Sequence, residues 1–174
     1  KPPEIYLGAD VAKIQLPDGR EVWSTSSRRT YVKNSILVVE RLLKEDREGY
    51  VLKSKARNPF PTGYKPEIDV TDELDQTLAS RFMQLIGILR WAVEIGRIDI
   101  YLETSLLSQY QANPRSGHLE AAYHIFAYLK ARPNAEMVFD PTPIEPDRTL
   151  FECQDWSYSV YGYEDLKEEL PSDM

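Results

Sequence analysis

The chain has 174 residues, 42% of them hydrophobic and 28% charged, a composition typical of a folded domain rather than a disordered segment. Its most apolar stretch, residues 82–93, is interrupted by Gln84 and Arg90, which excludes a membrane-spanning helix there. A single cysteine, Cys153, excludes an internal disulfide and a cysteine-rich zinc site, and favours an intracellular protein. The first residues contain neither an initiator methionine nor an apolar leader, so we expect the chain to be part of a longer polypeptide.

The formal net charge of −7 is unevenly distributed. Residues 1–57 carry 12 Lys and Arg against 8 Asp and Glu, a net charge of +4, whereas residues 134–174 carry 2 against 11, a net charge of −9. The acidic total argues against a free-standing, non-specific DNA-binding protein. Because phosphate binding depends on local charge, the basic N-terminal third is still a candidate for contact with nucleic acid.

The N-terminal residues predict a β-hairpin. Apolar side chains alternate from Ile5 to Val11 and then change phase, which predicts a strand with a bulge near residues 12 and 13. A Pro-Asp-Gly turn at residues 17–19 then leads into an antiparallel return strand at residues 21–24. An isolated hairpin is marginally stable in water, so this one requires a further strand or a helix as partner.

An amphipathic helix is predicted over residues 28–44, capped by Ser26 and Ser27. Its apolar face consists of Val32, Ile36, Val39 and Leu43. On its flank, Glu40 and Lys44 have the spacing of an ordinary ion pair within one helix. The following residues, 53–71, contain three prolines and predict an extended strap on the surface.

Three further helices are predicted over residues 72–133, and we expect them to pack as a small bundle. The first is capped by Thr71 or Asp72 and ends at Gly96; the third opens at Ser116 and stops at Pro133. Their apolar faces consist of Phe82, Leu85, Ile86, Leu89 and Val93 in the first helix, and of Leu119, Ala122, Tyr123, Phe126 and Leu129 in the third.

The middle helix of the three is expected to begin at Asp99, its N-cap, and to end at Asn113-Pro114. Leu102, Leu106 and Tyr110 follow one another at intervals of four residues and predict its buried face.

The order of these elements predicts an α+β fold: an N-terminal antiparallel β-hairpin followed by a helix, then a three-helix bundle, a short strand at residues 137–139 and an irregular acidic tail. The expected divisions of the chain are residues 1–52, 53–71, 72–133 and 134–174.

The residues point to no self-sufficient active site. His118 and His124 lie six positions apart on one helix, rotated by roughly 240°, so they cannot chelate one ion together and are interpreted as structural. Cys153 has no neighbouring histidine or helix start to activate it as a nucleophile. The acidic residues at 72–75 are explained by the positive end of a helix dipole. We therefore expect no catalytic residue, metal or cofactor within this chain.

Phosphate binding is the better-supported chemistry. Basic side chains open the first helix beside a basic hairpin, and aromatic side chains nearby are suited to stack on bases or to pack. The residues concerned are Lys13, Arg20, Arg28, Arg29, Lys33, Tyr6, Trp23 and Tyr31. An ordinary solvated basic helix face explains the same charges, so both interpretations stay open at this point.

Several short motifs follow one another along the chain: YLGAD at residues 6–10, LIGILRW at 85–91, GRIDI at 96–100, LLSQY at 106–110 and AYLK at 127–130, with Pro114 and His118 between the last two. In this order they resemble the C-terminal part of the reverse transcriptase of copia-type LTR retrotransposons. The first is similar to the primer-grip strand of that family. The third resembles its Arg-Pro-Asp-Ile turn, with Ile98 in place of the proline.

The resemblance spans residues 4–139 and implies the end of the palm with its primer-grip hairpin (1–52), the strap, a helical thumb (72–133) and a connector towards a ribonuclease H domain. On this hypothesis Tyr6, Leu7 and Gly8 set the primer end of an RNA/DNA primer-template duplex, while the phosphate contacts come from Lys13, Arg28, Arg29 and Lys33. In the family the catalytic aspartates, with their Mg²⁺, belong to an upstream Tyr-x-Asp-Asp hairpin. Because this chain contains no Asp-Asp pair, we expect it to be inactive alone, with the neighbouring palm and ribonuclease H domains as partners and no membrane.

Two alternatives come from other classes. In the first alternative, the chain is a non-catalytic module or an inactive retroelement remnant, and its bundle and aromatic tail bind a protein partner. The aromatic residues of the tail are Trp156, Tyr158, Tyr161 and Tyr163. The other alternative is an α+β domain that retains no function.

Overall fold

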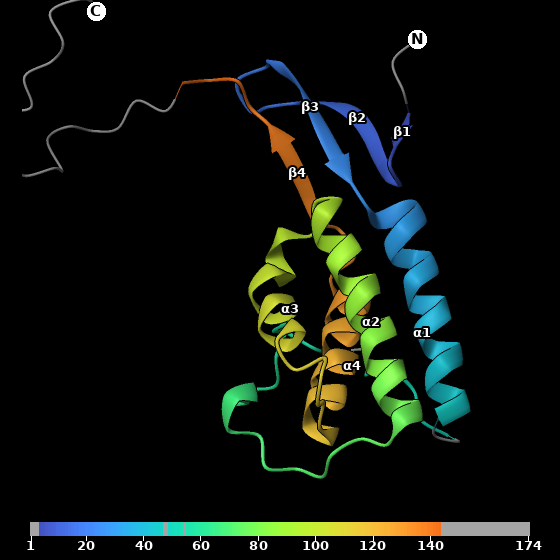
Figure 1. Ribbon diagram of the computed structural model, residues 1–174. Helices are drawn as coiled ribbons and strands as arrows, with labels where there is room; N and C mark the ends of the chain where they lie inside the picture. Colours follow the sequence, from blue (N-terminus) through green and yellow to red (C-terminus); the bar gives the residue numbers. More distant parts are fainter. Residues whose placement is uncertain (1–3, 47–48, 54, 144–174) are drawn as a thin grey trace, which may run out of the picture. The chain divides into compact units, whose positions relative to one another are not determined.

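The computed structural model describes residues 4–46, 49–53 and 55–143, without the side chains of Arg28 and Arg29. The chain up to Pro141 forms one compact unit. Its α+β architecture confirms the predicted fold class, with one antiparallel sheet and four α-helices in the described residues (Figure 1). The predicted irregular tail, from residue 144 onwards, lies outside the described residues.

The sheet has four strands in the order β1-β2-β3-β4, each antiparallel to its neighbour. The strands are β1 (Ile5–Tyr6), β2 (Ala9–Gln15), β3 (Glu21–Ser26) and β4 (Glu136–Phe139). The predicted Pro-Asp-Gly turn joins β2 to β3, with Gly19 at φ +87° and the N–H of Leu16 donating to the carbonyl of Arg20 (2.8 Å). The C-terminal strand, also predicted, pairs with β3 and supplies the partner that the hairpin requires.

The prediction of one bulged strand from Ile5 onwards is wrong. The chain reverses at Leu7 and Gly8, which makes β1 and β2 separate strands, and β2 then pairs with β3 in unbroken register. Val11 and Ile14 are both half-buried, and they lie on opposite faces of the sheet. The change of phase in the apolar pattern therefore reflects partial burial on both faces rather than a bulge.

The helices follow the predicted order, and α4 begins at Ser116 as predicted, whereas α1, α2 and α3 begin later than predicted. A π-helical turn at Arg28–Val32 precedes α1 (Lys33–Asp46), and α2 (Gln76–Glu94), α3 (Tyr101–Ser108) and α4 (Ser116–Ala131) follow. The N-cap of α2 is Asp75 and not Thr71 or Asp72; its carboxylate accepts a hydrogen bond from the N–H of Leu78 (2.8 Å). The predicted cap by Ser27 is wrong as well, because its buried hydroxyl has no hydrogen-bond partner among the described residues.

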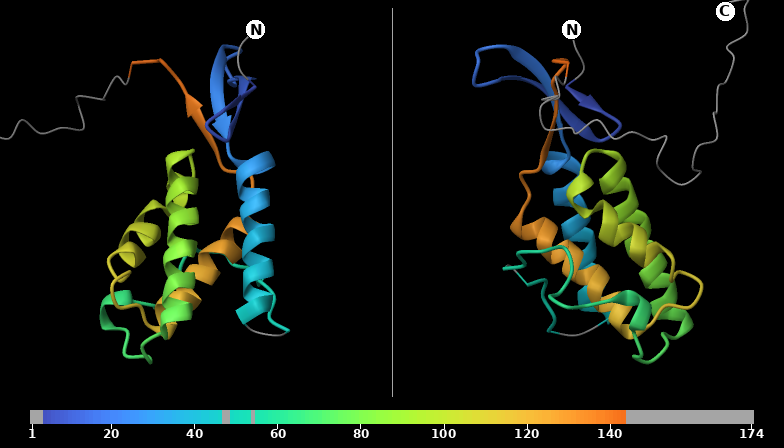
Figure 2. Two further views of the ribbon diagram at one scale, coloured as in Figure 1. Left: turned by 45° about the vertical axis from the view of Figure 1, so that its right-hand side comes forward. Right: turned by 90° about the vertical axis from the view of Figure 1, so that its left-hand side faces the viewer.

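One hydrophobic core joins all four α-helices. α4 contacts α1, α2 and α3, and it crosses between α1 and α2 (Figure 2). The predicted apolar faces of the first, second and fourth helices lie against this core, with Ile36 and Val93 only partly buried. The other members are buried: Val32 of the π-helical turn, Val39, Leu43, Phe82, Leu85, Ile86, Leu89, Leu119, Ala122, Tyr123, Phe126 and Leu129. The predicted three-helix bundle thus has α1 as a fourth member, because α1 buries its stripe against the same core.

The buried face of α3 differs from the prediction. Leu102 is 62% exposed, whereas Ile100, Thr104 and Leu107 are buried. α3 also ends at Ser108, earlier than predicted, and so has only two turns. A helix this short has little periodicity to read, and its orientation follows from how it packs against α2 and α4.

Asp99 pairs with a buried arginine instead of capping a helix. The guanidinium of Arg97 is fully buried and donates two hydrogen bonds, from Nε (2.9 Å) and Nη2 (2.7 Å), to the Asp99 carboxylate. Burial raises the pKa of Asp99, but the bonds and charge of Arg97 outweigh it and leave the pKa below its usual value. A buried cation requires such a partner, which explains why this carboxylate is not available as a cap.

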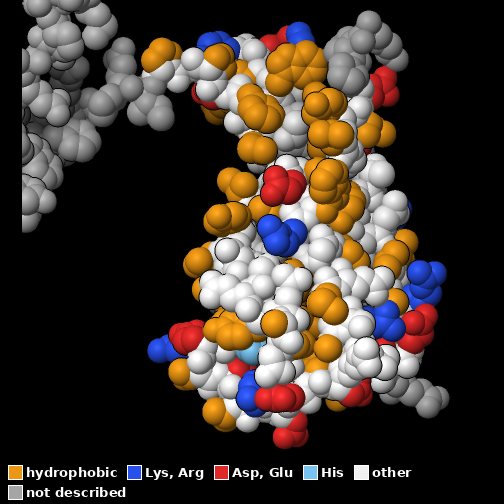
Figure 3. Space-filling view, viewed as in Figure 1, with side chains coloured by type: hydrophobic (Ala, Val, Ile, Leu, Met, Phe, Trp, Pro, Cys, Tyr) orange, Lys and Arg blue, Asp and Glu red, His pale blue; other side chains and the backbone are white. Residues whose placement is uncertain are grey.

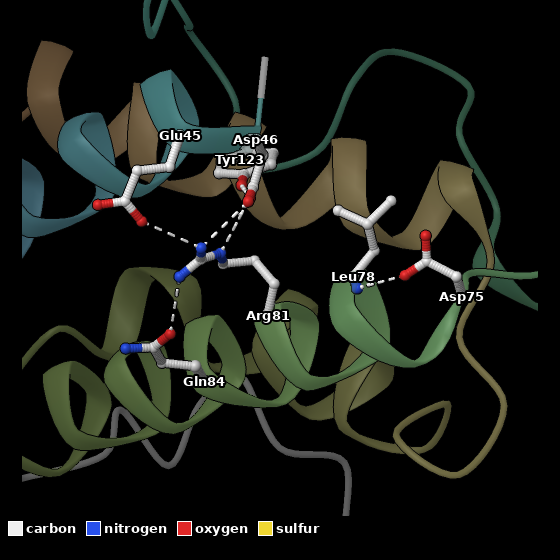
Figure 4. Close-up of polar contacts among 7 residues, drawn as sticks. All are labelled: Glu45, Asp46, Asp75, Leu78, Arg81, Gln84 and Tyr123. Atoms are coloured by element: carbon white, nitrogen blue, oxygen red, sulfur yellow. Dashed lines mark hydrogen bonds and ion pairs between the residues drawn. The ribbon is translucent and has the colours of Figure 1, made fainter.

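Ion pairs connect the helices where they cross. The Arg81 guanidinium of α2 bonds the Asp46 carboxylate at the end of α1 (2.9 Å from Nε), and the Tyr123 hydroxyl of α4 donates to the same carboxylate (2.9 Å) (Figure 4). The predicted pair of Glu40 with Lys44 is wrong. Glu40 instead bonds Lys130 of α4 (2.6 Å), because the packing of α4 brings this lysine alongside α1.

The predicted strap at residues 53–71 lies against the bundle and contains a short 3₁₀ turn, Pro66–Ile68. It is not wholly on the surface, since Ala56 and Pro66 are buried. The buried His118 ring bonds the Pro66 carbonyl through Nε2 (3.1 Å) and accepts from the N–H of Arg115 through Nδ1 (3.0 Å). These two bonds fix its tautomer and make His118 a structural anchor of the strap.

No helix in the part of the chain that the structure describes has the length and apolar character needed to cross a membrane. The divisions expected at residues 52, 71 and 133 stay predictions.

Candidate nucleic-acid interface

The turn between β1 and β2 presents the predicted primer-binding residues. Tyr6 pairs with Ala9, which leaves Leu7 and Gly8 as a two-residue turn with φ of +50° and +92°. Such a turn needs positive φ at both positions, a conformation that suits Asn or Gly and costs about 1 kcal/mol for a residue such as leucine. The side chains of Tyr6 and Leu7 are both 63% exposed. A strained turn that displays two apolar side chains to solvent is typical of a binding site.

The C-terminal end of α2 lies beside the sheet near this turn. A Cβ atom on Gly8 would lie 3.9 Å from Nε1 of Trp91, and one on Gly96 would lie 3.5 Å from Cε of Met137 in β4. The Tyr31 hydroxyl, on the π-helical turn, donates to the carbonyl of Ile88 (3.0 Å). Tyr31 is therefore used for packing, one of its two predicted roles, and its pKa is raised by burial.

The predicted cations separate into two groups along the sheet. Ser26 pairs with Asp10, so the π-helical turn and Lys33 begin beside the end of β2 that carries the Leu7–Gly8 turn. Lys13 pairs with Trp23, three residues or about 10 Å further along the strand. The basic group near the turn thus contains the start of α1 but not Lys13.

Lys33 is exposed at the first position of α1. The predicted roles of the Arg28 and Arg29 side chains lie outside what the structure describes. Asp10, half-buried on β2, places a carboxylate at the same end of the sheet.

Lys13 has its own partners. Its ammonium lies 2.8 Å from Glu21 and 5.6 Å from the ring centre of Trp23. Trp23 pairs in turn with Phe139 of β4, and both aromatics are exposed. Lys13, Trp23 and Phe139 thus form a row of one cation and two aromatic rings across three strands. Hydrophobic side chains also gather over the sheet on the face shown in Figure 3. The ion pair with Glu21 reduces the charge that Lys13 offers to a phosphate.

The other candidate chemistries have structural explanations. The rings of Tyr110 and His118 are stacked, with their centres 4.3 Å apart. Nε2 of His124 lies 3.2 Å from the Asn58 carbonyl oxygen, and burial lowers the pKa of this histidine. Of the acidic residues at 72–75, Asp75 caps α2 and Glu73 pairs with Arg115 (3.3 Å). Among the described residues, no group of three or more His, Cys, Asp or Glu side chains converges as a metal site. Cys153 lies outside the described residues.

Comparisons of the chain with protein-family models, with characterised proteins and with solved structures gave no match.

Two residues of this surface were missed by sequence reasoning. Trp91 belongs to one of the recognised motifs, but nothing in its helical spacing indicates that it lies beside Gly8, more than eighty residues earlier. Phe139 is the last residue of a predicted strand, yet its pairing with Trp23 depends on a register that no local signal determines.

Proposed function

We propose that this chain is the part of a copia-type reverse transcriptase that holds a primer-template duplex in place, with polymerisation performed by catalytic aspartates outside it. The single observation that carries the proposal is the Leu7–Gly8 turn. It lies where the motif resemblance expects the primer grip, it is strained, and it exposes Tyr6 and Leu7. An apolar pair displayed at a turn is suited to pack against the sugar and base of a terminal nucleotide.

The surroundings of the turn support contact with a backbone. Lys33 opens α1 beside it, and the N-terminal third of the chain carries a net charge of +4. An exposed cation such as Lys33 provides a phosphate contact that fixes the position of a strand without reading its sequence. Positioning, rather than chemistry, is what this arrangement can perform.

A binding assay with the 174-residue chain tests the proposal. The affinity for a fluorescein-labelled RNA/DNA primer-template duplex is measured by anisotropy over a range of KCl concentrations. Replacing Lys33 by Ala should lower the slope of log Kd against log salt by about 1, the value expected for one lost phosphate contact. The matched control is Lys44→Ala, which removes an exposed lysine from the far end of α1 and should leave the slope unchanged.

The proposal fails if the chain does not bind the duplex at low salt. The phosphate role of Lys33 fails if both lysine variants give the wild-type slope.

A second candidate, a protein-interaction module, is favoured by one observation. Ile98, Tyr101 and Leu102 are all exposed at the start of α3, where an apolar face without a described neighbour is typical of a protein contact. A chain that binds no nucleic acid but whose Tyr101→Ser/Leu102→Ser variant loses a protein partner would support this candidate instead.

A further inference from the structure

A side chain from the helical bundle lies beside the turn that carries the proposed function. Among the described residues, and apart from the chain neighbours of Gly8, the only heavy atom within 4 Å of a Cβ position on Gly8 is Nε1 of Trp91, at 3.9 Å. Trp91 lies on α2, one turn before the end of that helix, and is 44% exposed. The N–H edge of the indole therefore lies beside the turn, and the residue is partly open to solvent.

The turn needs such a support. Leucine at φ +50° is a strained choice for the first position of a two-residue hairpin turn, where Asn or Gly is preferred. A strained backbone persists only where its surroundings hold it in place. β1 constrains the turn through its backbone pairing with β2, but it has only two residues and both of its side chains are exposed. Among the described residues outside the chain neighbours of Gly8, Trp91 of α2 has the heavy atom that lies nearest the Cβ side of the turn.

α2 is well placed to transmit position to the sheet. Its Ile88 carbonyl accepts the Tyr31 hydroxyl, and Gly96, just after its end, meets Met137 of β4. Four turns of the same helix are anchored in the core, through residues such as Phe82 and Leu89. Trp91 therefore places a residue of this core-anchored helix beside the turn.

We infer that Trp91 is a positioning residue, whose indole holds the Leu7–Gly8 turn in the orientation in which Tyr6 and Leu7 meet the primer terminus. This inference rests on the proposed function. It separates two properties of the chain: overall duplex affinity, which depends on cations such as Lys33, and preference for a recessed primer end, which depends on Trp91.

The decisive measurement compares two duplexes of equal length, one with a recessed 3′ primer end and one blunt. The wild-type chain should bind the recessed duplex about five-fold more tightly or better. Replacing Trp91 by Leu should bring this ratio close to 1 and change the Kd for the blunt duplex less than about two-fold. The matched control is Met83→Leu, because Met83 lies on the same helix, is also 44% exposed, and is two turns from Trp91.

The outcomes separate the two claims. A wild-type chain that binds neither duplex overturns the proposed function itself. Binding without a preference for the recessed end, or a preference that survives Trp91→Leu, overturns the inference and leaves the proposed function intact.

A second measurement needs no nucleic acid and a milder variant, in case Trp91→Leu does not fold. The Gly8 amide resonance is followed by ¹⁵N NMR in Trp91→Phe, which keeps an aromatic ring of smaller size. Its chemical shift and its rate of hydrogen exchange should change in Trp91→Phe but not in Met83→Leu, since only Trp91 lies beside Gly8. An unchanged Gly8 resonance in Trp91→Phe overturns the inference.

Discussion

Gly117, the second residue of α4, is required by a carboxylate that lies against it. A Cβ atom at this position would overlap Oδ2 of Asp69 and lie 2.8 Å from its Cγ. The carboxylate is held there by the Tyr64 hydroxyl (2.6 Å) and by the hydroxyl and N–H of Thr71 (2.6 and 2.9 Å), while Gly117 itself donates to the Thr71 hydroxyl (2.8 Å). Replacing Gly117 by Ala must therefore displace Asp69 and break part of this network.

The size of the effect follows from the bonds that are lost. Hydrogen bonds to a charged group contribute about 1.5–3 kcal/mol each, and Asp69 is only half-buried, so losing one or two of them costs about 2–4 kcal/mol. Alanine regains up to about 1 kcal/mol through its higher helix propensity. Gly117→Ala should lower the free energy of unfolding by about 1–3 kcal/mol and the Tm by about 3–10 °C.

Thermal unfolding followed by circular dichroism measures this change. Gly87→Ala is the matched control, because Gly87 lies in α2 with no heavy atom within 4 Å of its Cβ position, and this variant should be more stable by about 1 kcal/mol. In an Asp69→Ala background, Gly117→Ala should no longer destabilise the protein. A Gly117→Ala protein that melts at or above the wild-type temperature would show that the Asp69 carboxylate does not require glycine at this position.

Three further predictions concern single side chains. Burial raises the pKa of Asp69, but hydrogen bonds from Thr71 and Tyr64 outweigh that effect and leave the pKa of the folded protein below the ordinary value of 3.8. The ionised carboxylate therefore stabilises the fold above about pH 3.8, and this stabilisation is lost as the pH falls through the lower pKa of the folded protein. Urea midpoints should therefore decline more steeply below about pH 4 in the wild type than in Asp69→Asn. Arg81→Ala leaves the Asp46 carboxylate buried without its cation and should cost about 2–3 kcal/mol, whereas a double variant with Asp46→Ala should cost less than the sum of the single changes. Leu7→Asn should relieve the positive φ and raise stability by about 1 kcal/mol in urea unfolding, yet weaken binding to a recessed primer end; unchanged binding would show that the leucine side chain has no role there.

The leucine in the Leu7–Gly8 turn departs from what stability alone favours. A sequence selected for stability alone would place Asn or Gly at a position with φ of +50°. The leucine at this position is instead exposed, so its apolar side chain contributes little to the core. Local sequence preference and observed structure disagree here, and such disagreement is expected where a residue is retained for binding.

Much of the fold was determined by local sequence. The stripes of α2 and α4 repeat over about three turns, and a repeat of that length predicts both a helix and its buried face. The Pro-Asp-Gly turn is equally local, because Gly19 can adopt its positive φ whatever surrounds it. The α+β class and the order of the elements follow from such signals alone.

The tertiary structure decided what depends on contacts between distant residues. Glu40 pairs with Lys130 rather than Lys44, because packing brings α4 alongside α1. Asp99 pairs with Arg97, only two residues away, because tertiary packing buries that arginine and its charge then requires a partner. The same holds for the turn beside Trp91: positive φ at Gly8 is a local property, but the indole that lies beside it belongs to a helix more than eighty residues later. Sequence periodicity specifies which side chains leave solvent, whereas only the close packing of the core specifies which ones meet.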